Sequence, residues 1–320
     1  MLHIESVGIT SFDLYRNVAA WISGFEALLE QALDDAAGAM TAADPSEWAL
    51  SLIPDLDMAR RYASIERWRR GVAEWRRWAV EVRALRSQVI SDARAGRLLD
   101  WLAFADFSGH DFRQAVDFSA VDLPAGASFA AAQFLSDAWF SGARFGGPAN
   151  FRKARFAGTG LFEDCWFEGH ADFTDARFAK SVRFTSSVAM RGMSARNASF
   201  GKDAWLRSCQ FFGPVDYAQA RFAGEAGFGN CYYGCSVDFS EADFGDNAGF
   251  EYAIFSDKAD FEHASFGRHA RFQQSRFSKP PRFKAARFFG TCHFDDAMIP
   301  VLERPVAAGI DKIERWLRES

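Results

Sequence analysis

Histidines, cysteines and paired carboxylates are the side chains most able to catalyse a reaction or bind a metal, and in this chain they do not cluster. The six His residues are scattered, and none has a partner at a spacing typical of zinc sites. Asp295 and Asp296 are adjacent in sequence, so they need not converge on one substrate. No phosphate-binding loop, nucleotide-binding glycine motif or nucleophile elbow occurs. We therefore expect no catalytic residue, no metal site and no cofactor, and a protein that is not an enzyme. The His residues are His3, His110, His170, His263, His269 and His293.

The five cysteines indicate buried thiols and not metal ligands. Cys165, Cys209 and Cys231 each stand two places before a large aromatic residue, at a position that is small along much of the chain. We expect them to point inward as free thiols. The first residues lack the basic start and apolar stretch of a secretion signal, and no run of about twenty uncharged apolar residues occurs. These features predict a cytoplasmic location and no membrane association.

The elements that must position these side chains follow an unusual rhythm of large residues. Between residues 259 and 283, Phe residues recur at gaps of five, six, five and six. A helix returns to one face after three or four residues and a strand after two, so neither period explains the pattern. In units of eleven from Ala105, the chain reads roughly Ala-x-Phe-x-x-Ala-x-Phe-x-Gly-x eighteen times and ends near Met298. Only Ala189 and Ala195 leave a position of the large residue small. We expect a local kink or bulge there, and we expect the flexible side chains of Met190 and Met193 to turn inward beside the gaps.

This pattern resembles the pentapeptide-repeat family, as runs such as ADFTDARF, VDFSEADF and ADFEHASF illustrate. The resemblance covers residues 105–298 and implies a right-handed, four-sided β-helix in which Phe and Ala point inward. Every second side has one residue more than the family's five, and Gly is frequent in that longer side. We expect these glycines to form a bulge or a corner with positive φ. Two units of eleven then make one coil, which predicts about nine coils of 22 residues stacked about 4.8 Å apart.

The outward positions support a coil of 22 residues, because residue types recur at 22 and not at 11. In alternate units of eleven, the residue just before the first Phe belongs to a largely acidic series. The residue just before the second Phe belongs to an Arg series in one set of alternate units and to an apolar series in the other set. The acidic series is Asn150, Asp172, Ser194, Asp216, Asp238 and Asp260. The Arg series is Arg155, Arg177, Ser199 and Arg221, and the apolar series is Trp166, Val188, Gln210, Tyr232 and Ile254.

The two ends of the chain predict helices and a division into three parts. Residues 1–104 form an α-helical region, 105–298 the β-helix, and 299–320 a C-terminal capping helix. In the first part we expect a helix over about 11–40 and a long helix over about 57–94. The long helix carries an apolar face from Ile65 to Val89 that includes Trp68, Trp75 and Trp78.

An outward aromatic strip is the best candidate for a functional surface, because a monomer seldom leaves such residues in water. The candidate residues are Trp139, Leu161, Trp166, Val188, Trp205, Phe212, Tyr232, Tyr252 and Ile254. They predict a non-catalytic scaffold that binds another protein or its own copy as a homodimer. Alternatively, the Trp-bearing helix lies across the strip.

A rival function follows from the resemblance alone, since some family members imitate duplex DNA and protect DNA gyrase. The ladder Asp172, Asp216, Asp238 and Asp260 would be the start of such a surface. However, residues 107–298 contain 22 acidic and 21 basic residues, so this region is close to neutral. Direct nucleic-acid binding has less support, because the basic residues do not gather with exposed aromatic residues on one face.

Overall fold

The computed structural model describes residues 57, 60–88 and 93–300. Contacts divide these residues into two compact units. One unit contains the described residues up to Phe107 together with Leu123–Ala127, and the other contains Ser108–Asp122 and the described residues from Ser128 onward. The predicted helix over 11–40 and the predicted C-terminal helix lie outside the described residues. Within the described residues, none of the helices is long and apolar enough to cross a membrane.

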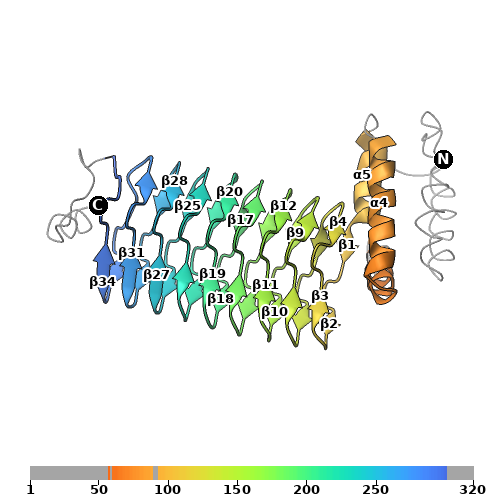
Figure 1. Ribbon diagram of the computed structural model, residues 1–320, viewed down its shortest axis with the longest axis horizontal. Coiled ribbons are helices and arrows are strands. Elements are labelled where there is room, and N and C mark those ends of the chain that lie inside the picture. Colours follow the sequence, from red (N-terminus) through yellow and green to blue (C-terminus); the bar gives the residue numbers. More distant parts are fainter. Residues whose placement is uncertain (1–56, 58–59, 89–92, 301–320) are drawn as a thin grey trace, which may run out of the picture. The chain divides into compact units, whose positions relative to one another are not determined.

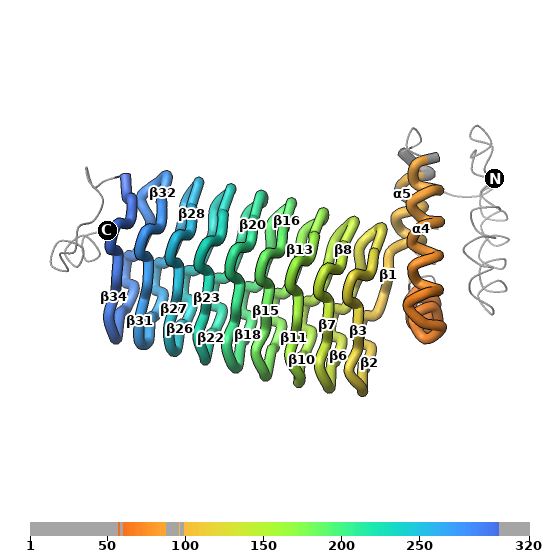
Figure 2. Tube along the Cα trace, in the orientation of Figure 1, coloured from red at the N-terminus to blue at the C-terminus, as the bar shows by residue number. Residues whose placement is uncertain are grey.

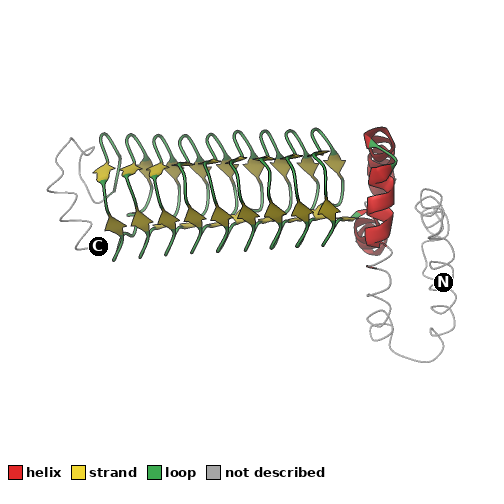
Figure 3. Cartoon of the chain, turned by 90° about the horizontal axis from the view of Figure 1, so that it is seen from below, coloured by secondary structure: helices red, strands yellow, loops and turns green. Residues whose placement is uncertain are grey.

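The repeat forms a β-solenoid with four parallel sheets, one for each side of the coil (Figures 1 and 2). Successive strands of one sheet come from successive coils, which lie side by side along the solenoid (Figure 3). The first sheet contains β1 (Ala105–Asp106), β5 (Ala127–Ser128), β9 (Ala149–Asn150), β13 (Ala171–Asp172), β17 (Met193–Ser194), β21 (Val215–Asp216), β25 (Val237–Asp238) and β29 (Ala259–Asp260). The second sheet contains β2 (Asp111–Phe112), β6 (Gln133–Phe134), β10 (Arg155–Phe156), β14 (Arg177–Phe178), β18 (Ser199–Phe200), β22 (Arg221–Phe222), β26 (Asp243–Phe244), β30 (Ser265–Phe266) and β33 (Arg287–Phe288).

The other two sheets complete the coil. The third sheet contains β3 (Val116–Asp117), β7 (Ala138–Trp139), β11 (Gly160–Leu161), β15 (Val182–Arg183), β19 (Ala204–Trp205), β23 (Ala226–Gly227), β27 (Asn247–Gly249), β31 (His269–Arg271) and β34 (Thr291–His293). The fourth sheet contains β4 (Asp122–Leu123), β8 (Arg144–Phe145), β12 (Trp166–Phe167), β16 (Val188–Ala189), β20 (Gln210–Phe211), β24 (Tyr232–Tyr233), β28 (Ile254–Phe255) and β32 (Arg276–Phe277).

The register of the strands confirms the coil of 22 residues. Arg155 pairs with Arg177, and Trp166 pairs with Val188, each 22 residues further along the chain. The strands are only two or three residues long, so each coil is stabilised by the hydrogen bonds it makes with the coils on either side. The sequence-based fold of stacked 22-residue coils is therefore correct.

Stacked aromatic rings fill the centre of the coils. Phe129, Phe151 and Phe173 form one stack of the first sheet, with ring centroids 4.9 and 4.7 Å apart. Ala154, two places before Phe156, is also buried, whereas the intervening Arg155 is exposed. The predicted inward Phe and Ala positions are thus confirmed, and burying a ring in each side supplies the apolar contact that strands of two residues cannot provide alone.

The positive φ angles lie at a different position from the one the glycines predict. They recur every eleven residues, two places after the first Phe, and most are not glycine: Asp164, Asp175 and Asn197 have φ of 54, 60 and 56°. Gly158 and Gly213, in the longer side, have no positive φ. The prediction for these glycines was wrong.

Close stacking of the coils explains these two glycines instead. A Cβ atom on Gly158 would lie 2.3 Å from the carbonyl carbon of Ser136, and one on Gly213 would lie 2.4 Å from that of Arg191. Each contact is made by the backbone of the preceding coil, which cannot move aside as a side chain can. Glycine is therefore needed at these positions for space and not for its conformational freedom.

The N-terminal unit also corrects the single helix predicted over 57–94. Residues 60–69 are helical, Gly71 adopts φ of +101°, and the chain continues in α4 (Val72–Gln88) and α5 (Ala93–Ala103). The break occurs because Gly71 adopts a conformation that ends one helix before the next begins. The predicted apolar face is partly confirmed within this unit: Trp75 and Trp78 are buried, with ring centroids 4.8 Å apart.

Around Ala189 and Ala195, where small residues replace large ones, the strands keep the same register as their neighbours. The prediction of a kink or bulge in these strands was therefore wrong. Met193 is 2% exposed, which confirms that its side chain turns inward. Met190 was expected to do the same, but it is 41% exposed. Gly192, with φ of +85°, lies between the outward and the inward methionine.

Candidate functional site

The aromatic strip lies on two neighbouring sides of the coil. Trp139, Leu161 and Trp205 are outward residues of β7, β11 and β19 in the third sheet. The apolar series, from Trp166 on β12 to Ile254 on β28, lies in register along the fourth sheet. We call the residues of this series, with Met190, Phe212 and Tyr252, the aromatic flank.

Several side chains of the aromatic flank are exposed. Trp166, Met190, Phe212, Tyr252 and Ile254 have exposed fractions of 40, 41, 44, 53 and 38%. Val188 and Tyr232 are partly buried, and the ring of Tyr232 lies 5.8 Å from that of Phe212. These side chains therefore leave a large apolar area facing solvent.

The third sheet contributes less exposed apolar area than the sequence suggests. The guanidinium of Arg207 lies 4.5 Å from the ring centroid of Trp205. A Cβ atom on Gly227 would lie 2.7 Å from that ring, so the indole lies over the next coil. Trp205 is thus partly buried by neighbours of its own sheet, whereas Trp139 remains 36% exposed.

The rings of the Trp-bearing helix pack within the N-terminal unit. Trp75 is 0% exposed, and its ring centroid lies 5.8 Å from that of Phe107, within the N-terminal unit. Trp78 is 2% exposed. Trp75 and Trp78 are therefore buried among residues of the N-terminal unit, and the alternative that the Trp-bearing helix lies across the aromatic flank stays a prediction.

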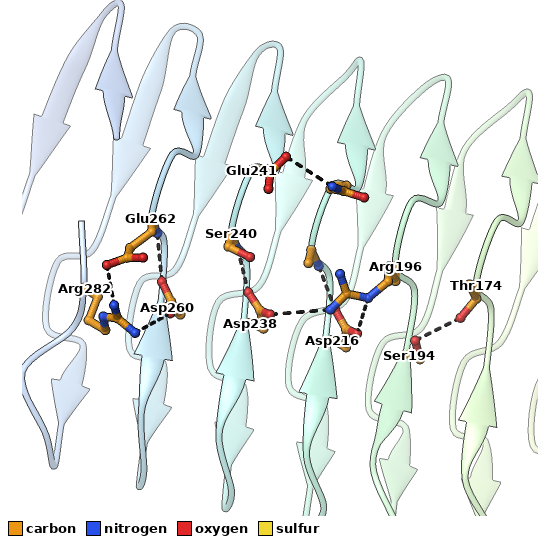
Figure 4. A network of polar contacts seen from close by, with 12 residues as sticks. Thr174, Ser194, Arg196, Asp216, Asp238, Ser240, Glu241, Asp260, Glu262 and Arg282 are labelled. Carbon is orange, nitrogen blue, oxygen red and sulfur yellow. Dashed lines mark hydrogen bonds and ion pairs between the residues drawn. The ribbon is translucent and has the colours of Figure 1, made fainter. Parts of the chain in front are cut away.

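The acidic ladder is built into the turns of the first sheet (Figure 4). Oδ1 of Asp216 and Oδ1 of Asp238 accept hydrogen bonds from the backbone N–H two residues later, at 2.9 and 2.8 Å. Arg196 lies between the two carboxylates, 2.8 Å from that of Asp216 and 3.7 Å from that of Asp238. Asp260 is paired with Arg282 at 3.1 Å. The carboxylates of the ladder therefore stabilise the turns, and nearby arginines neutralise much of their negative charge.

The buried thiols are free, as predicted. Sγ of Cys165 donates a hydrogen bond to the carbonyl oxygen of Phe140 at 3.0 Å, and Sγ of Cys209 donates to that of Phe184 at 2.8 Å. Burial raises the pKa of the Cys165 thiol to about 12 and also raises that of Cys209 well above its usual value. Both sulfurs therefore stay protonated and unreactive near neutral pH.

A polar chain that the sequence analysis missed lies on the third sheet. Oγ1 of Thr291 lies 2.6 Å from Nδ1 of His269 and 2.9 Å from Nε2 of His293. The sequence could have predicted this contact, because positions 269 and 291 are 22 residues apart and are therefore neighbours on adjacent coils. Nδ1 of His293 is 3.9 Å from Asp295, too far for the hydrogen bond that would orient a catalytic base, and both side chains are over 40% exposed. Among the described residues, no group of three or more His, Cys, Asp and Glu could hold a metal ion.

Comparison with known proteins identifies the repeat. Residues 140–188 match the family model for pentapeptide repeats (9 copies). A search of curated proteins and a search of solved structures found no match. The matched residues include β11, β12 and Val188 of β16, which carry part of the aromatic strip.

Proposed function

Because residues 140–188 are pentapeptide repeats and the same rhythm continues through sheets of eight and nine strands, we propose that this protein is a non-catalytic β-solenoid scaffold. Its binding surface is the aromatic flank, and its partner there is a second copy of the chain. One observation supports this most directly: five large apolar side chains on one region of the solenoid are between 38 and 53% exposed. Covering them would remove a large apolar area from water.

The charge pattern favours a second copy as the partner. From Trp166 to Ile254, five successive outward positions of the fourth sheet carry no charge. The charged residues of this sheet stand at its two ends: Arg144, before the series, is paired with Glu168, and the exposed Arg276 follows it. A neutral surface can meet itself across a two-fold axis without like-charge repulsion, whereas it offers no paired charges to a strongly acidic or basic partner.

The experiment compares two double variants by light scattering over a range of protein concentrations. Trp166→Gln with Tyr232→Gln removes two rings from the aromatic flank, and Gln210 shows that glutamine is tolerated in this series. Asp238→Ser with Asp260→Ser is the control, since Ser194 occupies the same series of the first sheet. We expect the parent and the control to dimerise and the flank variant to be monomeric.

Two results would contradict the proposal. A parent that remains monomeric at high micromolar concentration would exclude a second copy as the partner. A flank variant that dimerises as well as the control would exclude the aromatic flank as the interface. Circular dichroism of each variant verifies that the β-solenoid is intact, so that loss of the dimer is not loss of the fold.

A further inference from the structure

A basic groove lies on the second sheet, which carries none of the aromatic flank. Its cavity has a volume of about 640 Å³. Its cationic lining consists of Arg155, Arg177 and Arg221, which lie on β10, β14 and β22, and of Lys153. All four side chains are exposed. This is a volume typical of sites for small molecules.

The arrangement of the groove arginines destabilises the fold, because it places like charges next to each other. Arg155 and Arg177 are directly paired neighbours on adjacent parallel strands, about 4.8 Å apart. Like charges in this relationship destabilise a sheet. In the described part of the chain, none of the three groove arginines has a carboxylate within 4.0 Å, although other outward arginines have at least one, namely Arg144, Arg152, Arg183 and Arg196.

The remaining residues that line the groove do not neutralise its positive charge. The carboxylate of Asp175 accepts a hydrogen bond from Nδ2 of Asn197 at 2.7 Å, so it is engaged along its own corner of the coil. Ser199 occupies the position between Arg177 and Arg221 and leaves room where a third long side chain would otherwise lie. With four cationic groups and one carboxylate, the formal charge of the lining is +4 − 1 = +3.

We propose that this groove binds a small ligand that carries two or more phosphate groups. Arg presents paired N–H donors that match phosphate oxygens, and three arginines along one line can each contact a different phosphate. The line is short: Arg155 and Arg221 are three coil steps apart, about 14 Å. Beyond its ends stand Gln133 and Asp243, so the basic track does not continue as a nucleic-acid strand requires. The proposal does not depend on the aromatic flank.

Isothermal titration calorimetry of the full chain with inorganic tripolyphosphate, at a constant ionic strength of about 0.15 M, tests this site. We expect saturable binding to one site. Arg155→Gln with Arg177→Gln should weaken it at least tenfold, and Arg177→Lys should weaken it less, because the charge stays but the paired donors are lost. The matched control is Arg183→Gln, an outward arginine of the next side that is 3.7 Å from Glu163, and it should bind as the parent does.

A thermal unfolding scan separates loss of the site from loss of the fold. Without ligand, the Arg155→Gln, Arg177→Gln variant should unfold at the same temperature as the parent or higher, since repulsion is relieved. Tripolyphosphate should raise the unfolding temperature of the parent and not of this variant. The proposal is wrong if no saturable binding occurs, if Arg183→Gln weakens binding equally, or if a ten-nucleotide single strand binds more tightly than tripolyphosphate.

Discussion

The hydroxyl of Tyr217 lies 3.7 Å from Sδ of Met193, in the interior of the solenoid. Tyr217 belongs to the ring stack of the first sheet, and the position one coil earlier is Ala195. The buried Met193 thus contacts the end of the stack where a ring is missing. A flexible thioether side chain is well suited to such an irregular gap.

This contact predicts that the two neighbouring methionines differ in their effect on stability. Met193→Ala should lower the free energy of unfolding by about 2–5 kcal/mol, because it removes a buried side chain and leaves a cavity. Met190→Ala should change it by about 0.5 kcal/mol or less, since Met190 is 41% exposed. Urea titrations of both variants measure the difference, and equal losses would contradict the inward assignment of Met193.

The glycines of the longer side should be intolerant of any side chain. Gly158→Ala would place a Cβ atom 2.3 Å from the backbone of the preceding coil and should cost about 1–3 kcal/mol or more. Gly96→Ala is the control: Gly96 lies in α5, has nothing within 4 Å of the added Cβ, and should be neutral or stabilising by up to about 1 kcal/mol. Thermal unfolding of the two variants should therefore shift in opposite directions or in one variant only.

The inward rings should carry much of the stability of each coil. Phe250 is 0% exposed, and its ring stacks on Phe228 at 5.0 Å and on Phe272 at 4.8 Å. Phe250→Ala should cost about 3–5 kcal/mol. Glu241→Ala should cost about 0.5 kcal/mol or less, because the outward side chain of Glu241 accepts a hydrogen bond from the side-chain amide of Gln219 at the surface, and alanine occupies the equivalent turn position at Ala285.

The sequence predicted the solenoid because its rhythm is set by packing that repeats in every coil. A ring at Phe129, Phe151 and Phe173 must face inward whatever the details of the corners, so period and register follow from residue type alone. The corners could not be predicted in the same way. Gly158 lacks the positive φ that was predicted for it, because a contact between coils and not a turn requires glycine there. Asp175 adopts a φ of 60° in a turn for which the pattern predicted none.

The sequence predicted which residues of the candidate surface line up, but not how exposed each side chain is. The line from Trp166 to Ile254 follows from the coil length, and the structure places these residues in one register. The exposed fraction of a side chain also depends on the residues beside it, which the repeat pattern does not specify. Trp205 is partly covered by Arg207 and lies over Gly227, and Met190 points outward although its neighbour Met193 points inward.

The buried thiols predict a loss of stability at alkaline pH. Burial raises the pKa of Cys165 to about 12 and that of Cys209 well above its usual value, whereas both ionise near pH 8.5 in the unfolded chain. Above pH 8.5 the unfolded state binds fewer protons than the folded state, so the free energy of unfolding falls as pH rises. The stability from these two thiols is fully present below pH 8.5. For each thiol the loss is about 1.4 kcal/mol per pH unit.

Urea titrations at several pH values between about 8 and 9.5 measure this slope, below the usual tyrosine pKa of about 10. Cys165→Ala with Cys209→Ala provides the matched variant, because Ala143 and Ala253 occupy the same inward series of the fourth side and are fully buried. The variant should lose less stability than the parent over the same range, since it has two fewer groups that ionise only when unfolded. Parallel slopes for parent and variant would mean that these thiols reach solvent in the folded protein.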